Sequence, residues 1–513
     1  MVTAMQEIER KYEAPVGVPL PDLTDLPKVA ARSADEVETL DAVYYDTAGF
    51  DLVRAGITLR QRTGGHDAGW HLKVPESAGV RTELRLPSSS ELPEEFTELL
   101  TARLRGRPLR PVARIATTRR RYTLEDSGGS DLAEVALDAV TAETFGRTST
   151  LTRWNEVEVE LAEGVSGGLK LLEAADRSLR RGGLRPARHG TKLELALSEA
   201  LSSAQPQASR PPQSQPSKSA TAGDALLRSL RSRLEELTAW DLLVRRDAPD
   251  SVHRMRVAAR RMRAVLQEFR PLLRAQEARE LISELRWLGE VLGRMRDEEV
   301  LGEHLSALFS QVPAELAIGP VQARISGHFE PRRAEGRRQI LQALGSDRYL
   351  ALLNTLEGFL AAAPLTARAG DAAAKAMPDL VARSYRRVRR REHAARDVPT
   401  GPARDAALHE VRKAVKRARY AAEVASPVVG KNARKSVKSL KRLQSVLGDH
   451  HDAVIASQAL RQLALDAYDN GENTFTYGLL HERETALAEA LGRRAHRTWK
   501  RANRRKRTAW MGG

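Results

Sequence analysis

Two kinds of periodicity divide the chain near residue 200. Before that point, short runs such as 56–62, 69–74, 80–86 and 155–161 alternate polar and apolar residues between turns containing Gly or Pro. This period of two predicts an antiparallel sheet or barrel with a few helices. Later, residues 224–244 and 275–295 place Leu, Val and Ala three and four positions apart, which predicts amphipathic helices. We therefore expect an α+β first domain and an all-α second domain.

The segment between the two patterns, residues 202–223, is rich in Pro, Ser and Gln and has no apolar period. We expect it to be a flexible linker. The chain of 513 residues is too long for one core. We predict domains at 1–201 and 224–500, followed by a basic tail without regular structure at 501–513.

Charged residues in the first half occupy alternating strand positions. In "EIERKY", Glu7, Glu9 and Lys11 share one face of a strand. The other acidic positions of this kind are Glu83, Glu134, Asp138, Glu156, Glu158 and Glu160, and the basic ones are Arg60, Arg62, His71, Lys73, Arg81, Arg85, Arg119 and Arg121. One interpretation is a sheet with a solvated face. The other is a closed barrel with a charged interior, in which carboxylates hold a divalent cation and Arg and Lys hold a phosphate chain.

Net charge differs strongly between the two halves. Residues 1–200 hold 27 Lys and Arg against 32 Asp and Glu, a net charge of −5, whereas residues 201–513 hold 56 against 35, a net charge of +21. This asymmetry indicates a polyanionic partner for the second half: nucleic acid, an acidic membrane surface or polyphosphate. Aromatic residues make up only 4% of the chain, which disfavours nucleic acid because few side chains can stack on bases.

The chain contains no cysteine, which excludes disulfides, thiolate nucleophiles and cysteine-based zinc sites. No stretch approaches the roughly 18 apolar residues of a membrane span, and the N-terminus has no signal-peptide core. We therefore expect a cytoplasmic protein with no membrane partner.

The second half contains an internal duplication. His253 and His409 are each followed by basic residues at offsets 3, 7, 8 and 10. Offsets 0, 3, 7 and 10 lie within an arc of about 80° on a helix, so each copy forms a cationic stripe headed by His. An Asp follows each His, Asp297 after 44 residues and Asp452 after 43. A single basic stripe is usually a solvated surface, but two matching copies favour a shared anion site. The two Asp residues either orient His or Arg groups or act as caps and salt-bridge partners.

The strand motifs resemble those of the CYTH family, the triphosphate tunnel metalloenzymes. The resemblance begins with the ExExK signature at 7–11 and continues through "YYDT" (44–47), "LRQR" (59–62), "RTE" (81–83), "TRRRY" (118–122), "NEVEVEL" (155–161) and "TKLELAL" (191–197). It implies an eight-stranded antiparallel tunnel that acts on triphosphate-containing substrates with Mg²⁺ or Mn²⁺.

The resemblance also implies roles for individual residues. The metal-side carboxylates would be Glu7, Glu9, Asp138, Glu158 and Glu160. The triphosphate-binding set would be Lys11, Arg60, Arg62, Lys73, Arg81, Arg119, Arg121, Arg188 and Lys192, and the catalytic residues Glu158, Glu160 and Lys11. Thr191 stands where the family often has Ser, which preserves the hydroxyl. Glu134 and Glu156 are either additional ligands or salt-bridge partners.

The duplicated helices resemble the CHAD domain, a helical module that binds polyphosphate, with halves at about 224–365 and 375–500. The implied polyphosphate-binding residues are His253, Arg256, Arg260, Arg261, Arg263, His409, Arg412, Lys413, Lys416, Arg417, Arg419 and Lys441. Together the two resemblances imply a metal-dependent hydrolase of inorganic triphosphate whose helical domain binds polyphosphate or docks the enzyme on granules. Adenylate cyclase, thiamine or nucleoside triphosphatase, and a non-catalytic polyphosphate-binding protein remain alternatives. The sequence leaves the oligomeric state open.

Overall fold

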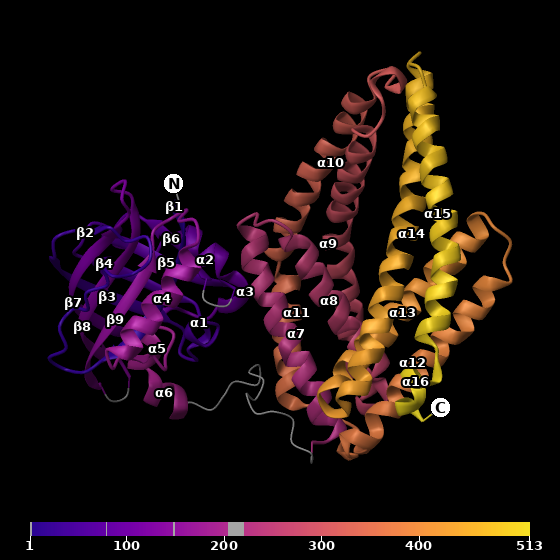
Figure 1. Cartoon of the computed structure of the whole chain (residues 1–513). Coiled ribbons are helices and arrows are strands. Elements are labelled where there is room, and N and C mark those ends of the chain that lie inside the picture. Colours follow the sequence, from indigo (N-terminus) through magenta and orange to yellow (C-terminus); the bar gives the residue numbers. More distant parts are fainter. Residues whose placement is uncertain (1–2, 78–79, 147–148, 204–219, 513) are drawn as a thin grey trace. The chain divides into compact units, whose positions relative to one another are not determined.

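The computed structural model describes residues 3–77, 80–146, 149–203 and 220–512 (Figure 1). The chain divides into two compact units, residues 1–205 and 206–513. Most of the predicted linker 202–223 lies outside the described residues. Helix α6 (Ser198–Ser203) extends into its start, and α7 (Ala222–Arg245) begins at its end.

The first unit is an antiparallel barrel of eight long strands. They are β1 (Thr3–Ala14), β3 (Glu36–Asp46), β4 (Thr58–Thr63), β5 (Gly69–Ser77), β6 (Val80–Leu86), β7 (Arg110–Glu125), β8 (Asp131–Thr144) and β9 (Leu151–Leu161). Hydrogen bonding runs in the order β1-β6-β5-β4-β3-β7-β8-β9, and pairing of β9 with β1 closes the ring. Two-residue strands β2 (Ala31–Arg32) and β10 (Arg185–Pro186) pair with β7 and β1. The predicted eight-stranded tunnel is confirmed.

Much of the apolar surface of the barrel lies on its outer face, where other parts of the chain cover it. Outward-facing residues of β1, β8 and β9, such as Tyr12, Val135 and Val157, form a core with Leu172 of α4 (Gly168–Arg181). Because strand side chains alternate, the polar positions between them point into the barrel. Besides α6, the other helices of this unit are α1 (Asp51–Arg54), α2 (Glu94–Leu99), α3 (Thr101–Leu104) and α5 (Lys192–Ala196).

The second unit is helical, as predicted. The helices after α7 are α8 (Ser251–Glu268), α9 (Ala275–Phe309), α10 (Val321–Leu344), α11 (Asp347–Ala362), α12 (Ala373–Arg396), α13 (Pro402–Val429), α14 (Lys431–Asp469) and α15 (Phe475–Ala502). Short 3-10 turns occur at Arg270–Leu272, Ala314–Leu316 and Ala367–Gly370. No helix among the described residues is long and apolar enough to span a bilayer.

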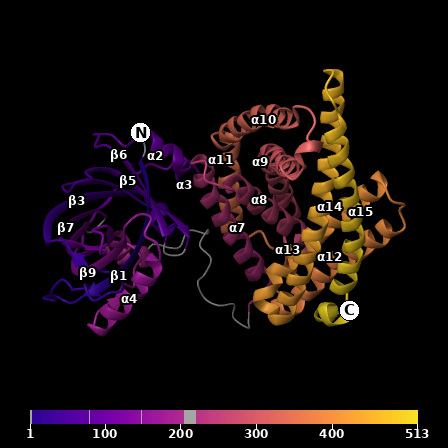
Figure 2. The same cartoon turned by 45° about the horizontal axis from the view of Figure 1, so that its top comes forward.

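Two series of packed helices reproduce the sequence duplication. The chain packs α7 on α8, α8 on α9 and α9 on α10, and then repeats this order from α12 to α15 (Figures 1 and 2). The two halves meet where α8 contacts α13. They meet again in an apolar cluster. There, Leu305 of α9 and Phe329 of α10 pack with Leu460 of α14 and Tyr477 of α15. The two predicted stripe helices are therefore neighbours.

Residues 501–512 are ordered, so the prediction of an unstructured tail was wrong. Helix α16 (Arg505–Thr508) and a 3-10 turn, η4 (Ala509–Met511), follow α15. The indole Nε1 of Trp510 donates a hydrogen bond to Ser436 Oγ at 2.8 Å, and Met511 is buried. The many charges of this segment suggested solvation, but Trp510, Met511 and a hydrogen bond from Ser436 Oγ to the carbonyl oxygen of Arg507 dock it.

Candidate functional site

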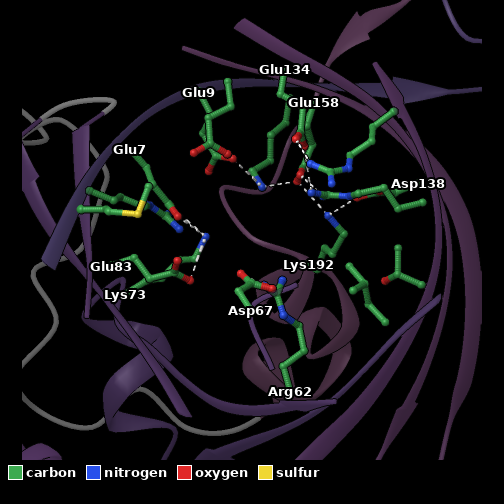
Figure 3. Close-up of a pocket in the computed structure, with 18 of the residues that line it drawn as sticks. Glu7, Glu9, Arg62, Asp67, Lys73, Glu83, Glu134, Asp138, Glu158 and Lys192 are labelled. Atoms are coloured by element: carbon green, nitrogen blue, oxygen red, sulfur yellow. Dashed lines mark hydrogen bonds and ion pairs between the residues drawn. The ribbon is translucent and has the colours of Figure 1, made fainter. Parts of the chain in front are cut away.

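A cavity of about 450 Å³ lies inside the barrel, and charged side chains line most of it (Figure 3). The carboxylates among the described lining residues are Glu7, Glu9, Glu38, Asp67, Glu83, Asp131, Glu134, Asp138, Glu158, Glu160 and Glu163. The cationic residues are Lys11, Arg60, Arg62, Lys73, Arg81, Arg85, Arg119, Arg121 and Lys192. These eleven carboxylates outnumber the nine cationic groups, so a polyanion is repelled unless additional positive charge accompanies it.

Strand register brings the charges of β1 and β9 together. Glu9 lies opposite Glu160, and Lys11 lies opposite Glu158. Directly opposed residues of antiparallel strands point to the same side of the sheet, which here is the interior. The alternating charges of "EIERKY" therefore line a cavity rather than a solvated sheet face.

The ammonium group of Lys192 binds three carboxylates on the β8–β9 side of the cavity. Its Nζ lies 2.8 Å from Asp138 Oδ2, 2.7 Å from Glu156 Oε1 and 2.7 Å from Glu158 Oε1 (Figure 3). The hydroxyl of Thr191 caps helix α5, which fixes the point where Lys192 enters the cavity.

Glu158 also contacts two cations from other strands. Its Oε1 is bound by Lys11 of β1, and its Oε2 accepts a hydrogen bond from Arg119 Nη2 at 2.6 Å. Arg119 in addition forms two bonds of 2.8 Å to Asp138. Glu134 serves here as a salt-bridge partner, 3.4 Å from Arg119 and in contact with Arg121.

A second group of charges surrounds Glu83, which is fully buried. Its Oε1 lies 3.3 Å from Arg60, 3.5 Å from Lys73 and 2.9 Å from His71 Nδ1. Lys73 also binds the carboxylate of Glu7 at 2.7 Å. This group and the Lys192 group lie on opposite sides of the cavity in Figure 3.

The two carboxylates predicted to be catalytic have opposite pKa shifts. Burial raises the pKa of Glu158, but Lys11, Lys192 and Arg119 together lower it well below its ordinary value. Burial, together with the neighbouring charge of Glu7, raises the pKa of Glu160 to about 7. These environments keep Glu158 ionised and make Glu160 the more basic carboxylate.

Carboxylates of β8 and β9 suit a hard divalent cation. Asp138, Glu156 and Glu158 each offer an oxygen within 4.8 Å of the others, and all three are buried. An all-oxygen set is the kind that Mg²⁺ and Mn²⁺ prefer. A second cluster of Asp67, His71 and Glu83 has similar spacing but includes an imidazole. Both clusters are paired with cationic side chains, so the donor type separates them. The first cluster offers carboxylate oxygens alone and is the better candidate for a hard cation, with Glu156 beside the predicted Asp138 and Glu158.

The structure brings all but one of the predicted tunnel residues to this cavity. Arg188 is the exception: its side chain is 77% exposed and lies 3.6 Å from Glu13 outside the described cavity lining. The sequence interpretation missed Glu83 and Asp67 as site residues. Glu83 was visible in the period-two pattern as a charge between Arg81 and Arg85, whereas Asp67 lies in a turn and carried no periodic signal.

In the second unit, α8 and α13 bring their cationic stripes together. We call Arg256, Arg260, Arg412 and Lys416 the central cationic cluster. Burial, followed by the charges of Arg260, Arg412 and Arg256, lowers the pKa of Lys416 to about 7. Such mutual repulsion is relieved when an anion is bound.

The two duplicated Asp residues flank this cluster. Asp297 forms bonds of 2.6 and 3.0 Å to Arg256. Asp452 raises the pKa of Arg412, although burial lowers it overall. His409 Nδ1 lies 3.3 Å from His451 Nδ1, and burial together with Arg412 lowers the pKa of His451 to about 4.

Some members of the predicted helical set point elsewhere. Arg419 is buried and bonds to Gln444 and Glu423 at 2.8 and 2.6 Å, so it stabilises packing of α13. Lys413 pairs with Glu410 on an exposed part of α13. Burial, followed by the neighbouring charges of Arg286 and Arg417, lowers the pKa of Arg263.

The fold and the site together define the class of protein. A closed antiparallel barrel with a charged, oxygen-rich interior, followed by a duplicated helical domain, is the arrangement of a CYTH domain joined to a CHAD domain. The CYTH domain family model matches residues 5–178, and the CHAD domain family model matches residues 228–461. The chain belongs to the CYTH–CHAD proteins. CYTH domains are metal-dependent tunnel enzymes with triphosphatase or cyclase activity.

Two relatives match nearly the whole length of the chain. Uncharacterized protein Rv2226 of Mycobacterium tuberculosis H37Rv and uncharacterized protein MT2285 of strain CDC 1551 are each 37% identical to this chain over 500 residues. The match covers 94% of this chain and 93% of each relative.

Solved structures resemble single parts of the chain. PptA from Streptomyces chartreusis is 23% identical, with a TM-score of 0.44 and coverage of 55% of this chain and 100% of its own. The CHAD domain from Ricinus communis is 26% identical, with a TM-score of 0.44 and coverage of 55% and 96%.

Proposed function

We propose that the barrel hydrolyses inorganic triphosphate, or a short polyphosphate chain, with Mg²⁺ or Mn²⁺, and that the helical domain binds polyphosphate. The observation that carries this proposal is the cavity itself, in which eleven carboxylates face nine cationic groups. A site that only bound anions would gain nothing from so many carboxylates. A site that binds an anion together with a divalent cation needs both sets.

The lining of the cavity favours an inorganic substrate. Among the described lining residues, Tyr44 is the one side chain with a phenyl or indole ring, and its hydroxyl accepts a hydrogen bond from Arg60 at 3.3 Å. A nucleobase or thiamine ring is usually bound against apolar and aromatic surface. This cavity instead presents charge on both of the sides shown in Figure 3.

Cationic side chains of the cavity would hold the substrate. Lys11, Lys73 and Lys192 each bind carboxylates at present, and each would exchange a carboxylate oxygen for a phosphate oxygen. Arg60 and Arg119, which are fixed by Glu83 and Asp138, would stabilise charge on the departing phosphate group.

Glu158 and Glu160 would have different roles in the reaction. Both oxygens of Glu158 are engaged by cations, so Glu158 serves as an anchor and metal ligand with Asp138 and Glu156. Glu160 faces the cavity opposite Glu9 and would accept the proton of the attacking water. When bound, Mg²⁺ or Mn²⁺ supplies charge compensation and lowers the pKa of a water molecule.

The central cationic cluster carries the proposal for the helical domain. Burial, together with the charges of the three arginines of the cluster, lowers the pKa of Lys416 to about 7. A polyanion with closely spaced charges, such as polyphosphate, relieves that repulsion. Retention of polyphosphate there would keep substrate near the enzyme or hold the enzyme on granules.

Phosphate release from triphosphate, ATP and thiamine triphosphate, with Mg²⁺, with Mn²⁺ and with a chelator, tests the function of the barrel. We expect metal-dependent turnover of triphosphate that is lost in Glu7→Gln/Glu9→Gln. Glu94→Gln/Glu95→Gln removes the same charge from exposed positions of α2 and serves as the control. Cyclic AMP formed from ATP would instead identify a cyclase. Absence of turnover with tight polyphosphate binding would identify a non-catalytic binding protein.

A further inference from the structure

One carboxylate of the cavity comes from a turn rather than from a strand. Asp67 lies in the hairpin between β4 and β5, at one end of the barrel. Its Oδ2 contacts the guanidinium of Arg62 and lies 3.4 Å from that of Arg85. Figure 3 shows Asp67 and Arg62 side by side, between the Glu83 group and the Lys192 group.

Two glycines set the position of this hairpin. Gly64 and Gly65 both have positive φ angles, 78° and 71°. A Cβ atom on Gly64 would lie 2.2 Å from the carbonyl oxygen of Thr39, and one on Gly65 would lie 2.7 Å from Leu40. The turn therefore folds closely against β3, which only glycine permits at these positions.

A hydrogen bond from the barrel wall fixes the backbone of Asp67. Nε2 of His71 lies 2.7 Å from the carbonyl oxygen of Asp67, and a carbonyl oxygen can only accept, so Nε2 is the donor. Glu83 lies 2.9 Å from the other ring nitrogen, Nδ1. Three features therefore hold the carboxylate of Asp67 in the cavity. They are the close packing of the turn on β3, the hydrogen bond from His71 of β5, and the contacts with Arg62 and Arg85.

The position of Asp67 matches that of an anionic substrate group. A carboxylate oxygen between two guanidinium groups has the contacts that a phosphate oxygen would take. Arg62 is largely buried, so few other anionic groups can reach its guanidinium. A phosphate at this end of the cavity would lie close to the negative charge of Asp67 as well as to Arg62 and Arg85.

We propose that Asp67 sets the length of the phosphate chain that the cavity accepts, by occupying the place that a phosphate beyond the third would take. This inference rests on the proposed function, because it concerns the substrate of the same cavity. Asp67 is a specificity-determining residue rather than a catalytic one. When its charge is removed, Arg62 and Arg85 become free to bind an additional phosphate.

The test compares linear triphosphate with linear tetraphosphate in the full chain. Variants Asp67→Asn, which keeps the shape of the side chain, and Asp67→Ala are measured beside wild type. Asp41→Asn is the matched control, because Asp41 lies on β3 between two lining residues, faces outward and pairs with Arg114. Two readouts are used: the ratio of kcat/KM values with Mg²⁺, and the ratio of Kd values by calorimetry with Mg²⁺ in a Glu160→Gln background. That background removes the proposed base and leaves Asp138, Glu156 and Glu158 in place.

Both ratios should shift toward tetraphosphate by about tenfold or more in the Asp67 variants, because a like-charge contact in a confined site is removed. Asp41→Asn should keep the wild-type ratios. Ratios within about twofold of wild type in both folded Asp67 variants would overturn the inference. If wild type hydrolyses neither anion, the proposed function fails, and the ratio of Kd values still decides the role of Asp67.

Discussion

Lys192→Met should destabilise the barrel, and a divalent cation should reverse much of the effect. Lys192 Nζ is the shared partner of Asp138, Glu156 and Glu158, at 2.7 to 2.8 Å. Its side chain is only 12% exposed. Met keeps most of the length of the side chain but leaves three buried carboxylates within 4.8 Å of one another without this ammonium group.

The size of the effect follows from this geometry. Removing one partner from a buried ion pair lowers the free energy of unfolding by about 3 kcal/mol or more. We use the lower value because the cavity admits water. For a domain of this size, 1 kcal/mol corresponds to about 2–4 °C in Tm. We therefore expect the Tm of the barrel to fall by about 6–12 °C in the absence of metal.

Calorimetric melting of the full chain, with a chelator or with millimolar Mg²⁺ or Mn²⁺, measures this effect. Metal should raise the Tm of Lys192→Met more than that of wild type, because the cation replaces the lost ammonium charge. Lys170→Met removes a lysine from an exposed position of α4 and should leave the Tm within about 1 °C of wild type. A Lys192→Met barrel that melts like Lys170→Met, or that metal does not stabilise, would refute the assigned carboxylate cluster.

Further predictions concern the reaction and the helical domain. Glu158→Gln should lower kcat/KM for triphosphate by about 100-fold or more, measured as phosphate release, while retention of the protein on immobilised polyphosphate stays unchanged. His253→Ala/His409→Ala should weaken that retention and spare triphosphate turnover; equal loss of both would contradict separate roles for the two domains. Because burial and neighbouring cations lower the pKa of Lys416 to about 7, its charged form predominates only below that pH. Polyphosphate affinity should therefore fall above pH 7, by at most about tenfold per pH unit, and Lys416→Met should flatten the profile.

Period-two alternation made the barrel and much of its site predictable. Once Glu7, Glu9 and Lys11 are placed on one strand face, strand geometry requires that they point together. The same rule applies to Glu158 and Glu160 on β9. The helical duplication was equally visible, because the offsets after His253 and His409 repeat along the chain.

Other features depended on contacts between segments far apart in the sequence. The sequence did not indicate which cation pairs with Glu156, and only the closed barrel brings Lys192 within 2.7 Å of it. Arg419 matches the stripe by its offset, yet it turns to Gln444 because α14 packs against that side of α13. Trp510 and Met511 likewise dock a segment whose composition suggested solvation.

The sequence by itself determined the two architectures, the sorting of charge by strand and helix face, and the chemical type of each site. Local periodicity determines these properties, since it fixes the direction of a side chain within its own element. Only the tertiary structure decided which charges pair, which of them are buried, and that Asp67 enters the cavity. Turn residues have no periodicity, so the direction of Asp67 is fixed only when Gly64 and Gly65 press the hairpin against β3 and His71 binds its backbone.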